Sequence, residues 1–360
     1  MFDDGLLADL HHAFCRVLDS GTFVSAGEVA GFETALASRL GVNHVAGVSS
    51  GTAALSLILR AAGVGPGDEV VLPANTFFAT AEAVMSVQAT PVFADADVTT
   101  ASVDPESVAA AITPRTSAII AVHMYGTPAA MPQLAAIANR HQLLLVEDAA
   151  QAFGAWCDGR PVGSLGDAAA MSFFPTKNLG ALGEAGAVTT NDAWLADRVR
   201  RLRDHGQSEK HHHVESGGNE RLDELQAAFL TVKLAHFDRS LVSRDRLASR
   251  YLRQLQAIPG VSILEVPGDV RAAYHLMVVR VDHRDAVLTR LRASGIGAAV
   301  HYPTPVHLQP ACRYLGVAEG ALPGCERLAR TVLSLPFYPE MTDAQLDRCV
   351  RGLANAIVVS

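Results

Sequence analysis

The sequence predicts an α/β protein whose large domain is built on a mostly parallel, doubly wound β-sheet flanked by helices. Two observations lead to this fold class. Between residues 44 and 174, short apolar runs alternate with helical segments. The apolar runs are also continuous, as in Glu69-Val-Val-Leu-Pro73 and Leu143-Leu-Leu-Val-Glu-Asp148, which is typical of strands buried on both faces of a parallel sheet. Strands and helices that alternate in this way fold into a sheet with helices packed on its faces.

Local pattern predicts each element of this domain in turn. Amphipathic periodicity indicates helices at 6–18 and 27–40, and the run starting at His44 indicates the first strand. A helix at 51–62 follows and ends at the Gly- and Pro-rich turn of 63–68. The remaining strands are expected at 69–73, 90–95, 117–123, 143–148 and 168–174, with helices at 77–88, 104–112 and 130–141.

A smaller α+β domain is expected at the C-terminal end. From about residue 195 the helical segments become longer and more charged, at 195–204 and 220–256. A chain of 360 residues also exceeds the length that one hydrophobic core usually serves. We therefore predict a large domain at 1–240 and a small domain at 241–360. The small domain should contain strands at 275–281, 296–302 and 332–335 and helices at 284–294, 321–330 and 342–356.

Composition and charge indicate which binding partners and which cellular location to expect. The formal net charge of -8 argues against binding to nucleic acid or to an anionic membrane surface. The most apolar region, 45–64, contains Ser49-Ser-Gly-Thr52 and Arg60, so it is not expected to cross a membrane. The five cysteines are widely spaced and form no CxxC pair, which favours reduced thiols and a cytoplasmic location.

The first motif with chemical meaning is Ser49-Ser-Gly-Thr-Ala-Ala-Leu55. A strand ends here, Gly51 permits a tight turn, and a helix begins. The N–H groups at the start of a helix are unpaired and lie at the positive end of its dipole, so they can bind a phosphate. Thr52 can add a hydroxyl donor. An ordinary N-terminal cap would explain the same pattern.

The second motif is Asp148 in Val146-Glu-Asp-Ala-Ala-Gln151, at the end of a predicted buried strand. A buried carboxylate is costly unless a positive group meets it. A metal ion, an arginine or a protonated pyridine nitrogen would each satisfy it.

The third motif is Lys177, which lies between the apolar run 168–174 and the glycines at 180, 183 and 186. An isolated lysine is usually a surface charge. A buried lysine has a lowered pKa and can attack an aldehyde. Ser172, in the same stretch, offers a hydroxyl to a phosphate.

The fourth motif is the His-rich segment 207–217, with consecutive histidines at 211–213. Neighbouring side chains on an extended segment point to opposite faces. No further ligand lies at helical spacing, so we expect a solvated or subunit-facing loop and no metal site.

Taken together, the first three motifs supply a phosphate cradle, a strand-end carboxylate and a lysine on one α/β chain. Pyridoxal 5'-phosphate requires this set, because its phosphate needs N–H donors, its pyridine nitrogen needs an acid and its aldehyde needs an amine.

With these motifs the chain resembles the DegT/StrS-type sugar-nucleotide aminotransferases, within the fold type I pyridoxal-phosphate enzymes. The resemblance runs from Gly21 to Pro339. It is carried by the blocks Ser50-Gly-Thr-Ala-Ala-Leu, Gly65-Pro-Gly-Asp-Glu-Val, Pro73-Ala-Asn-Thr-Phe-Phe-Ala-Thr, Glu147-Asp-Ala-Ala-Gln, Ser172-Phe-Phe-Pro-Thr-Lys-Asn-Leu-Gly, Asn219-Glu-Arg-Leu-Asp-Glu-Leu-Gln and His301-Tyr-Pro-Thr-Pro-Val-His. It implies a seven-stranded sheet in the large domain.

The resemblance also implies roles for single residues. Lys177 would be the catalytic lysine that binds the cofactor's aldehyde. Asp148 would pair with the pyridine nitrogen. The remaining cofactor contacts would be Gly51, Thr52 and Ser172 at the phosphate, Phe77 and Gln151 at the ring, and Asn219 from the neighbouring subunit of a homodimer with shared active sites; Arg221, His301 and Tyr302 would contact the substrate.

The implied reaction moves an amino group, from L-glutamate, to a nucleotide-linked keto-deoxysugar in amino-sugar biosynthesis, with the 3-keto sugar favoured over the 4-keto sugar. Two alternatives stay open. The acceptor could be a free cyclitol ketone, or the chain could be a non-catalytic regulatory member of the same fold. The sequence departs from the family pattern at Gly218, where a bulkier residue is common, and in the His-rich segment.

Overall fold

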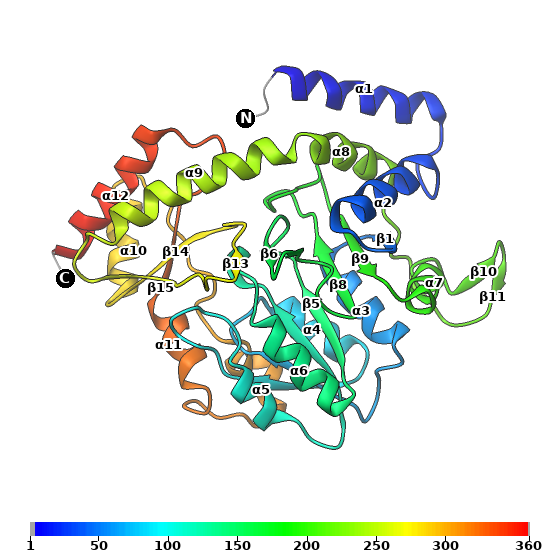
Figure 1. Ribbon diagram of the computed structural model, residues 1–360, viewed down its shortest axis with the longest axis horizontal. Helices are drawn as coiled ribbons and strands as arrows, with labels where there is room; N and C mark the ends of the chain where they lie inside the picture. The colour runs from blue at the N-terminus through cyan, green and yellow to red at the C-terminus, as the bar shows by residue number, and fades with distance from the viewer. Residues whose placement is uncertain (1–3, 359–360) are drawn as a thin grey trace.

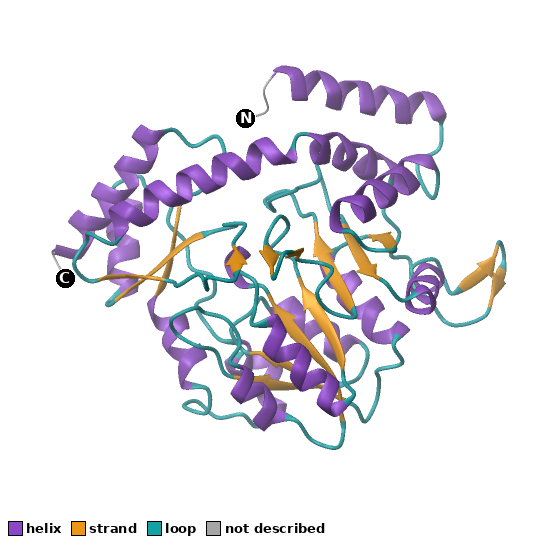
Figure 2. Ribbon diagram, viewed as in Figure 1, coloured by secondary structure: helices purple, strands orange, loops and turns teal. Residues whose placement is uncertain are grey.

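The computed structural model describes residues 4–358. At its centre is a seven-stranded sheet in the order β1-β9-β8-β5-β4-β2-β3, with helices packed on both faces (Figures 1 and 2). The strands of this sheet are β1 (His44–Val48), β2 (Glu69–Pro73), β3 (Thr90–Ala94), β4 (Thr116–Val122), β5 (Leu144–Asp148), β8 (Ala168–Ser172) and β9 (Gly186–Thr190).

Burial on both faces explains the continuous apolar runs. Neighbouring residues of one strand belong to different cores, since Val70 and Leu72 pack on one side of β2 and Val71 on the other. One core also contains residues of α3 (Gly51–Ala61), α4 (Phe78–Ser86) and α7 (Ala193–Leu202). The opposite core contains residues of α2 (Gly27–Leu40), α5 (Pro105–Ala111), α6 (Met131–His141) and α8 (Glu224–Ala235).

The predicted α/β class and mostly parallel sheet are confirmed, with one strand that the sequence did not reveal. Strand β9 pairs antiparallel with both β1 and β8. It follows the glycine-rich stretch after Lys177 and ends in two threonines, so it lacks the apolar run of its neighbours. A second short sheet, the hairpin of β10 (Gln207–Glu209) and β11 (His212–His213), projects from the body where a loop was expected (Figure 1).

Two further predictions are wrong. The helical segment 220–256 is two helices, α8 and α9 (Phe237–Leu255), which meet at His236. The strand expected at 296–302 does not form, and Ala299 makes only an isolated bridge to Ser334. The chain instead bends towards the large sheet here, since the Tyr125 hydroxyl donates a hydrogen bond to the carbonyl of His301.

The C-terminal residues build a separate small core. An antiparallel sheet in the order β12-β14-β15 packs with α9, α10 and α12. The 240/241 domain boundary stays a prediction, and it falls within α9. The remaining elements are α1 (Asp4–Ser20), η1 (Met124–Gly126), β6 (Trp156–Cys157), β7 (Arg160–Pro161), β12 (Val261–Ile263), β13 (Val270–Arg271), β14 (Met277–Val281), α10 (Arg284–Ala293), η2 (Val306–Leu308), η3 (Pro310–Leu315), α11 (Pro323–Thr331), β15 (Val332–Leu335) and α12 (Asp343–Val358).

No helix within residues 4–358 is both long enough and apolar enough to cross a membrane.

Candidate active site

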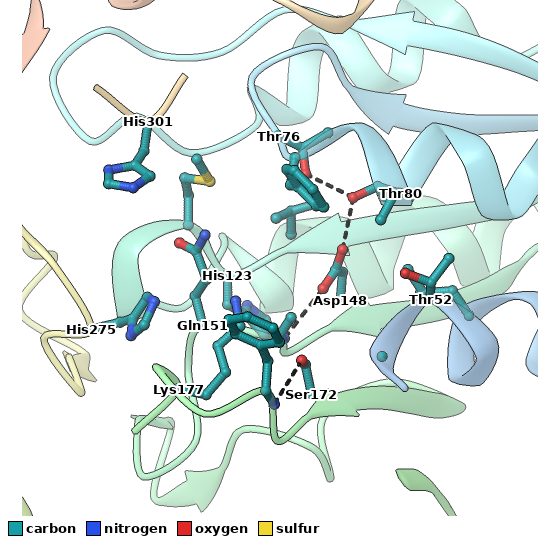
Figure 3. A pocket seen from close by; sticks show the side chains of 18 of the residues that line it. Thr52, Thr76, Thr80, His123, Asp148, Gln151, Ser172, Lys177, His275 and His301 are labelled. Carbon is teal, nitrogen blue, oxygen red and sulfur yellow. Dashed lines mark hydrogen bonds between the residues drawn. The ribbon is translucent and has the colours of Figure 1, made fainter. Parts of the chain in front are cut away.

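A cavity of about 430 Å³ opens at the carboxyl ends of the parallel strands (Figure 3). This is the edge of a doubly wound sheet where ligands bind. Most of the residues predicted from the sequence come together in its wall, namely Gly51, Thr52, Phe77, Asp148, Gln151, Ser172, Lys177, His301 and Tyr302. Asn219 and Arg221 do not line it.

One side of the cavity is the start of helix α3. Ser50 caps the helix by accepting a hydrogen bond from the N–H of Ala53 at 3.1 Å. Strand β8 passes very close, because a Cβ built on Gly51 would lie 2.7 Å from the Cβ of Ser172. A glycine is therefore required at position 51, and the Ser172 side chain lies beside the unpaired N–H groups of the helix. This arrangement is suited to a phosphate.

Asp148 ends strand β5 and is buried. Its Oδ2 accepts a hydrogen bond from the Thr80 hydroxyl at 2.8 Å, and Thr80 shares a second hydrogen bond of 2.8 Å with the hydroxyl of Thr76 (Figure 3). The N–H of Ala150 donates to Oδ1 at 3.2 Å. These two donors orient the Asp148 carboxylate, which can then pair with a protonated ring nitrogen.

Lys177 reaches into the same cavity from the turn that follows β8. Its backbone N–H donates to the carbonyl of Phe174 at 2.8 Å. Burial lowers the pKa of the Lys177 amine, and the Asp148 carboxylate partly offsets that effect. A larger share of this amine is therefore unprotonated and nucleophilic at neutral pH than for an exposed lysine.

The opposite wall is aromatic and amide-rich. The Oε1 of Gln151 accepts from the N–H of Tyr125 at 2.8 Å, and its Nε2 donates to the Tyr302 hydroxyl at 3.2 Å. Burial raises the pKa of Tyr302 to about 12, so this phenol stays protonated. The exposed ring of Phe77 lies 5.4 Å from that of Tyr302. A flat ring could stack here.

The structure adds residues that sequence reasoning missed. Thr80 and His275 also line the cavity. His123 lines the cavity too, as expected for a polar residue at a strand end like that of Asp148. The sequence around Thr80 and His275 carries no signal of this kind, because each residue reaches the site through contacts distant in sequence.

Asn219 and Arg221 lie outside this subunit's cavity. Asn219 is exposed and forms an isolated bridge with Asp204. The Arg221 guanidinium donates to Asp204 at 2.6 Å. The three adjacent histidines are exposed at the β10–β11 hairpin. Within residues 4–358, no group of three or more His, Cys, Asp or Glu side chains could hold a metal ion.

The residues present fit pyridoxal 5'-phosphate. The helix start beside Gly51 suits the phosphate, Asp148 suits the pyridine nitrogen and the half-buried Lys177 suits the aldehyde. A side chain in place of Gly51 would fill the cradle.

Comparisons with known proteins agree with this geometry. The family model of the DegT/DnrJ/EryC1/StrS aminotransferases matches residues 7–354. The chain is 46% identical over 347 residues to a dTDP-3-amino-3,4,6-trideoxy-alpha-D-glucose transaminase from Streptomyces venezuelae, covering 96% of this chain and 91% of that protein. It is 44% identical over 333 residues to a UDP-N-acetyl-3-dehydro-alpha-D-glucosamine 3-aminotransferase from Acidithiobacillus ferrooxidans, covering 92% of this chain and 89% of that protein.

Solved structures agree as well. The crystal structure of S. venezuelae DesV in complex with a ketimine intermediate has a TM-score of 0.95 and 44% identity, covering 98% of this chain and 95% of that chain. This similarity confirms the fold type I architecture. Aminotransferases of this kind depend on pyridoxal phosphate. The chain therefore belongs to the DegT/DnrJ/EryC1/StrS aminotransferase family and is a pyridoxal-phosphate-dependent aminotransferase.

Proposed function

We propose that this enzyme transfers the amino group of L-glutamate to the 3-keto group of a nucleotide-linked deoxysugar. The products are 2-oxoglutarate and the 3-amino sugar. The observation that carries the proposal is the convergence of Lys177, Asp148 and the start of α3 on one cavity. The names of two similar proteins, a dTDP-3-amino sugar transaminase and a UDP-3-dehydro sugar 3-aminotransferase, support carbon 3 of a nucleotide sugar.

The chain's own residues divide the work. Bound pyridoxal phosphate supplies an aldehyde that reacts with amines and a ring that withdraws electrons. The Lys177 amine takes a proton from the α-carbon of the amino-acid donor. The Asp148 carboxylate holds a proton at the pyridine nitrogen. The N–H groups at the start of α3 and the Ser172 hydroxyl hold the phosphate in place.

The proposal includes a homodimer with shared active sites. Asn219 is exposed and outside its own subunit's cavity, so a role at the cofactor phosphate requires it to act in the neighbouring subunit. Arg221, on the same segment, is placed with it as a substrate contact, together with His301 and Tyr302 from the cavity wall.

Borohydride reduction tests the role of Lys177. The sequence has three lysines, Lys177, Lys210 and Lys233, so peptide mapping can assign a pyridoxyl adduct unambiguously. We expect the adduct on Lys177 and its absence in Lys177→Ala. An adduct on another lysine would contradict the assignment.

A half-reaction screen tests the substrates. Glutamate should convert the bound cofactor to its amine form, and the absorbance spectrum reports this change. The amine form should then be consumed by a nucleotide-linked 3-keto sugar faster than by the 4-keto isomer or a cyclitol ketone. Consumption by the cyclitol alone would replace the proposed acceptor, and no conversion with any amino acid would indicate a non-catalytic protein.

A further inference from the structure

A second cavity of about 570 Å³ adjoins the cofactor cavity on the side of His275 and His301. Figure 3 shows these two histidines across the site from Thr52. Lys177 lies in the walls of both cavities. The second cavity is therefore next to the lysine at which the donor reacts.

The walls of the second cavity carry more lysine and arginine side chains than acidic ones. Glu340 is the single acidic side chain among its described lining residues. The lysine and arginine side chains are Lys177, Lys233 and Arg244. His236, His275 and His301 also line the cavity, and burial lowers the pKa of His275 and His301. Such an excess of donors favours an anionic ligand.

Arg244 is the unusual member of this set. It is 5% exposed, yet it forms no ion pair with any residue in the described part of the chain. Its Nη1 donates to the carbonyl of Tyr274 at 2.9 Å, and its buried Nε has no hydrogen-bond partner. Burial, partly offset by the charge of Glu340, lowers the pKa of Arg244 to about 10, which still leaves it charged at neutral pH. A buried cation without a directly paired counter-ion is costly, so the site is suited to a ligand that brings one.

Arg244 also lies near the reacting lysine. Tyr274, which accepts its hydrogen bond, precedes His275, and the His275 ring is 3.1 Å from the Oδ1 of Asn178, the neighbour of Lys177. Burial and then the charges of Lys177 and Arg244 lower the pKa of His275. Lys177 and Arg244 therefore both act on one imidazole.

Among the described residues of the cofactor cavity, Lys177 is the sole lysine or arginine. An amino-acid donor carries its carboxylate on the same carbon as the amine that reacts there. That carboxylate needs a cation close to Lys177 other than Lys177 itself, which must accept a proton. The planar guanidinium of arginine pairs well with a carboxylate.

We propose that Arg244 and the cavity it lines bind a carboxylate of the amino-acid donor, next to Lys177. This assignment rests on the proposed aminotransferase reaction. A phosphate of the nucleotide sugar would offer a similar oxyanion, but in a 3-keto sugar it is attached two carbons away from the reacting carbon. The donor's carboxylate lies closer to the lysine.

The test measures the two half-reactions separately in Arg244→Gln, Arg244→Lys and a control, Arg246→Gln. Arg246 lies two residues along α9, and its exposed guanidinium pairs with Asp343. We expect Arg244→Gln to raise the apparent dissociation constant for glutamate about 10-fold to 100-fold, the usual effect of losing a charge-assisted hydrogen bond. Arg244→Lys should lie between wild type and Arg244→Gln, and the control should match wild type.

The second half-reaction, in which a nucleotide keto-sugar consumes the amine form, should change by less than about twofold, since the proposal places the donor's carboxylate and not the sugar's phosphates at Arg244. A loss confined to that half-reaction would overturn the assignment in favour of a phosphate site. Unchanged glutamate binding in Arg244→Gln would overturn it outright. If Arg244→Gln does not fold, Arg244→Lys decides by the same criterion. Failure of the wild type to react with any amino acid would instead refute the proposed function.

Discussion

At the scale of single residues, the site depends on the hydrogen bonds that orient the Asp148 carboxylate. The Asp148 carboxylate accepts hydrogen bonds from the Thr80 hydroxyl and from the backbone N–H of Ala150. Thr80 is itself fully buried and is fixed by Thr76. The carboxylate therefore faces the cavity in one orientation, ready for a protonated ring nitrogen.

Replacing Thr80 with valine tests this support. Thr80→Val keeps the shape and removes the donor to Asp148, so the dissociation constant of pyridoxal phosphate should rise about 10-fold. Fluorescence titration of the apoenzyme measures it. Thr34→Val, at an exposed position of α2 whose hydroxyl bonds only its own helix, is the control. Unchanged cofactor affinity in Thr80→Val would show that Asp148 is oriented by other contacts.

Beside Asp148, Glu147 is a fully buried carboxylate with four donors. The His123 Nδ1 accepts from the N–H of Ala129 at 3.0 Å, so its Nε2 carries the proton that is donated to Glu147 at 2.9 Å. The other donors are the N–H groups of the loop at 163–166. This carboxylate ties the ends of β4 and β5 to that loop.

Glu147→Gln should reduce the free energy of unfolding by about 3 kcal/mol at neutral pH, because the amide presents a donor to other donors. Burial raises the pKa of Glu147, but its hydrogen bonds with His123 and the backbone outweigh this and hold it below 4.5. The contribution is therefore complete above pH 4.5 and is lost as the pH falls below it. Urea unfolding at several pH values measures the difference between wild type and variant.

The control is Glu82→Gln, at an exposed position of α4. It should change stability little at any pH. A difference for Glu147→Gln that does not shrink in acid would mean that the charge is not the source of its effect.

At the scale of elements, the phosphate cradle depends on the close packing of α3 against β8 and β9. A Cβ on Gly186 would lie 2.4 Å from the carbonyl of Ser50, and one on Gly51 would meet Ser172. Two glycines on elements distant in sequence therefore let a helix start approach a sheet. The glycine-rich stretch after Lys177 therefore leads into a strand of the sheet and also allows the close approach of the phosphate cradle.

Gly186→Ala should push the start of α3 away from β9 and so away from Ser172 on the neighbouring strand β8. We expect a loss of about 2 kcal/mol in stability from overpacking, together with weaker cofactor binding. Thermal unfolding and cofactor titration measure the two effects. Gly31→Ala is the matched control, since its Cβ would meet nothing within 4 Å and it should stabilise α2 by about 0.5–1 kcal/mol. Normal cofactor affinity in Gly186→Ala would argue against the cradle.

At the scale of the whole molecule, the proposed function needs two subunits. Asn219 is exposed in the segment between the β10–β11 hairpin and α8, while the other predicted cofactor contacts share one cavity. Two defective variants can therefore complement each other only if a site draws residues from both chains.

Co-expression of Lys177→Ala with Asn219→Ala tests this arrangement. Each variant alone should be nearly inactive. In mixed dimers one site receives both defects and the other none, so about a quarter of all sites should recover wild-type activity. Steady-state turnover of the purified mixture measures the recovery. The absence of recovery, with mixed dimers verified by affinity tags, would place Asn219 in its own subunit's function.

The sequence by itself determined the α/β class, the order of most strands and helices, and the candidate residues Lys177, Asp148, Gly51 and Ser172. It could do so because these features are local. A buried parallel strand is a continuous apolar run, and a phosphate-binding helix start needs a glycine and a hydroxyl at its first positions. The break between α8 and α9 and the loss of a strand at 296–302 were not visible, because contacts with distant segments outweigh local propensity there.

Only the tertiary structure decided which distant residues meet. Strand β9 exists because it pairs with β1 and β8, not because its own residues favour a strand. Thr80 supports Asp148 across 68 positions of sequence. Arg244 lies near Lys177 because α9 packs against the segment that carries Tyr274 and His275. Such contacts depend on the packing of whole elements, and no periodicity or spacing within one segment encodes them.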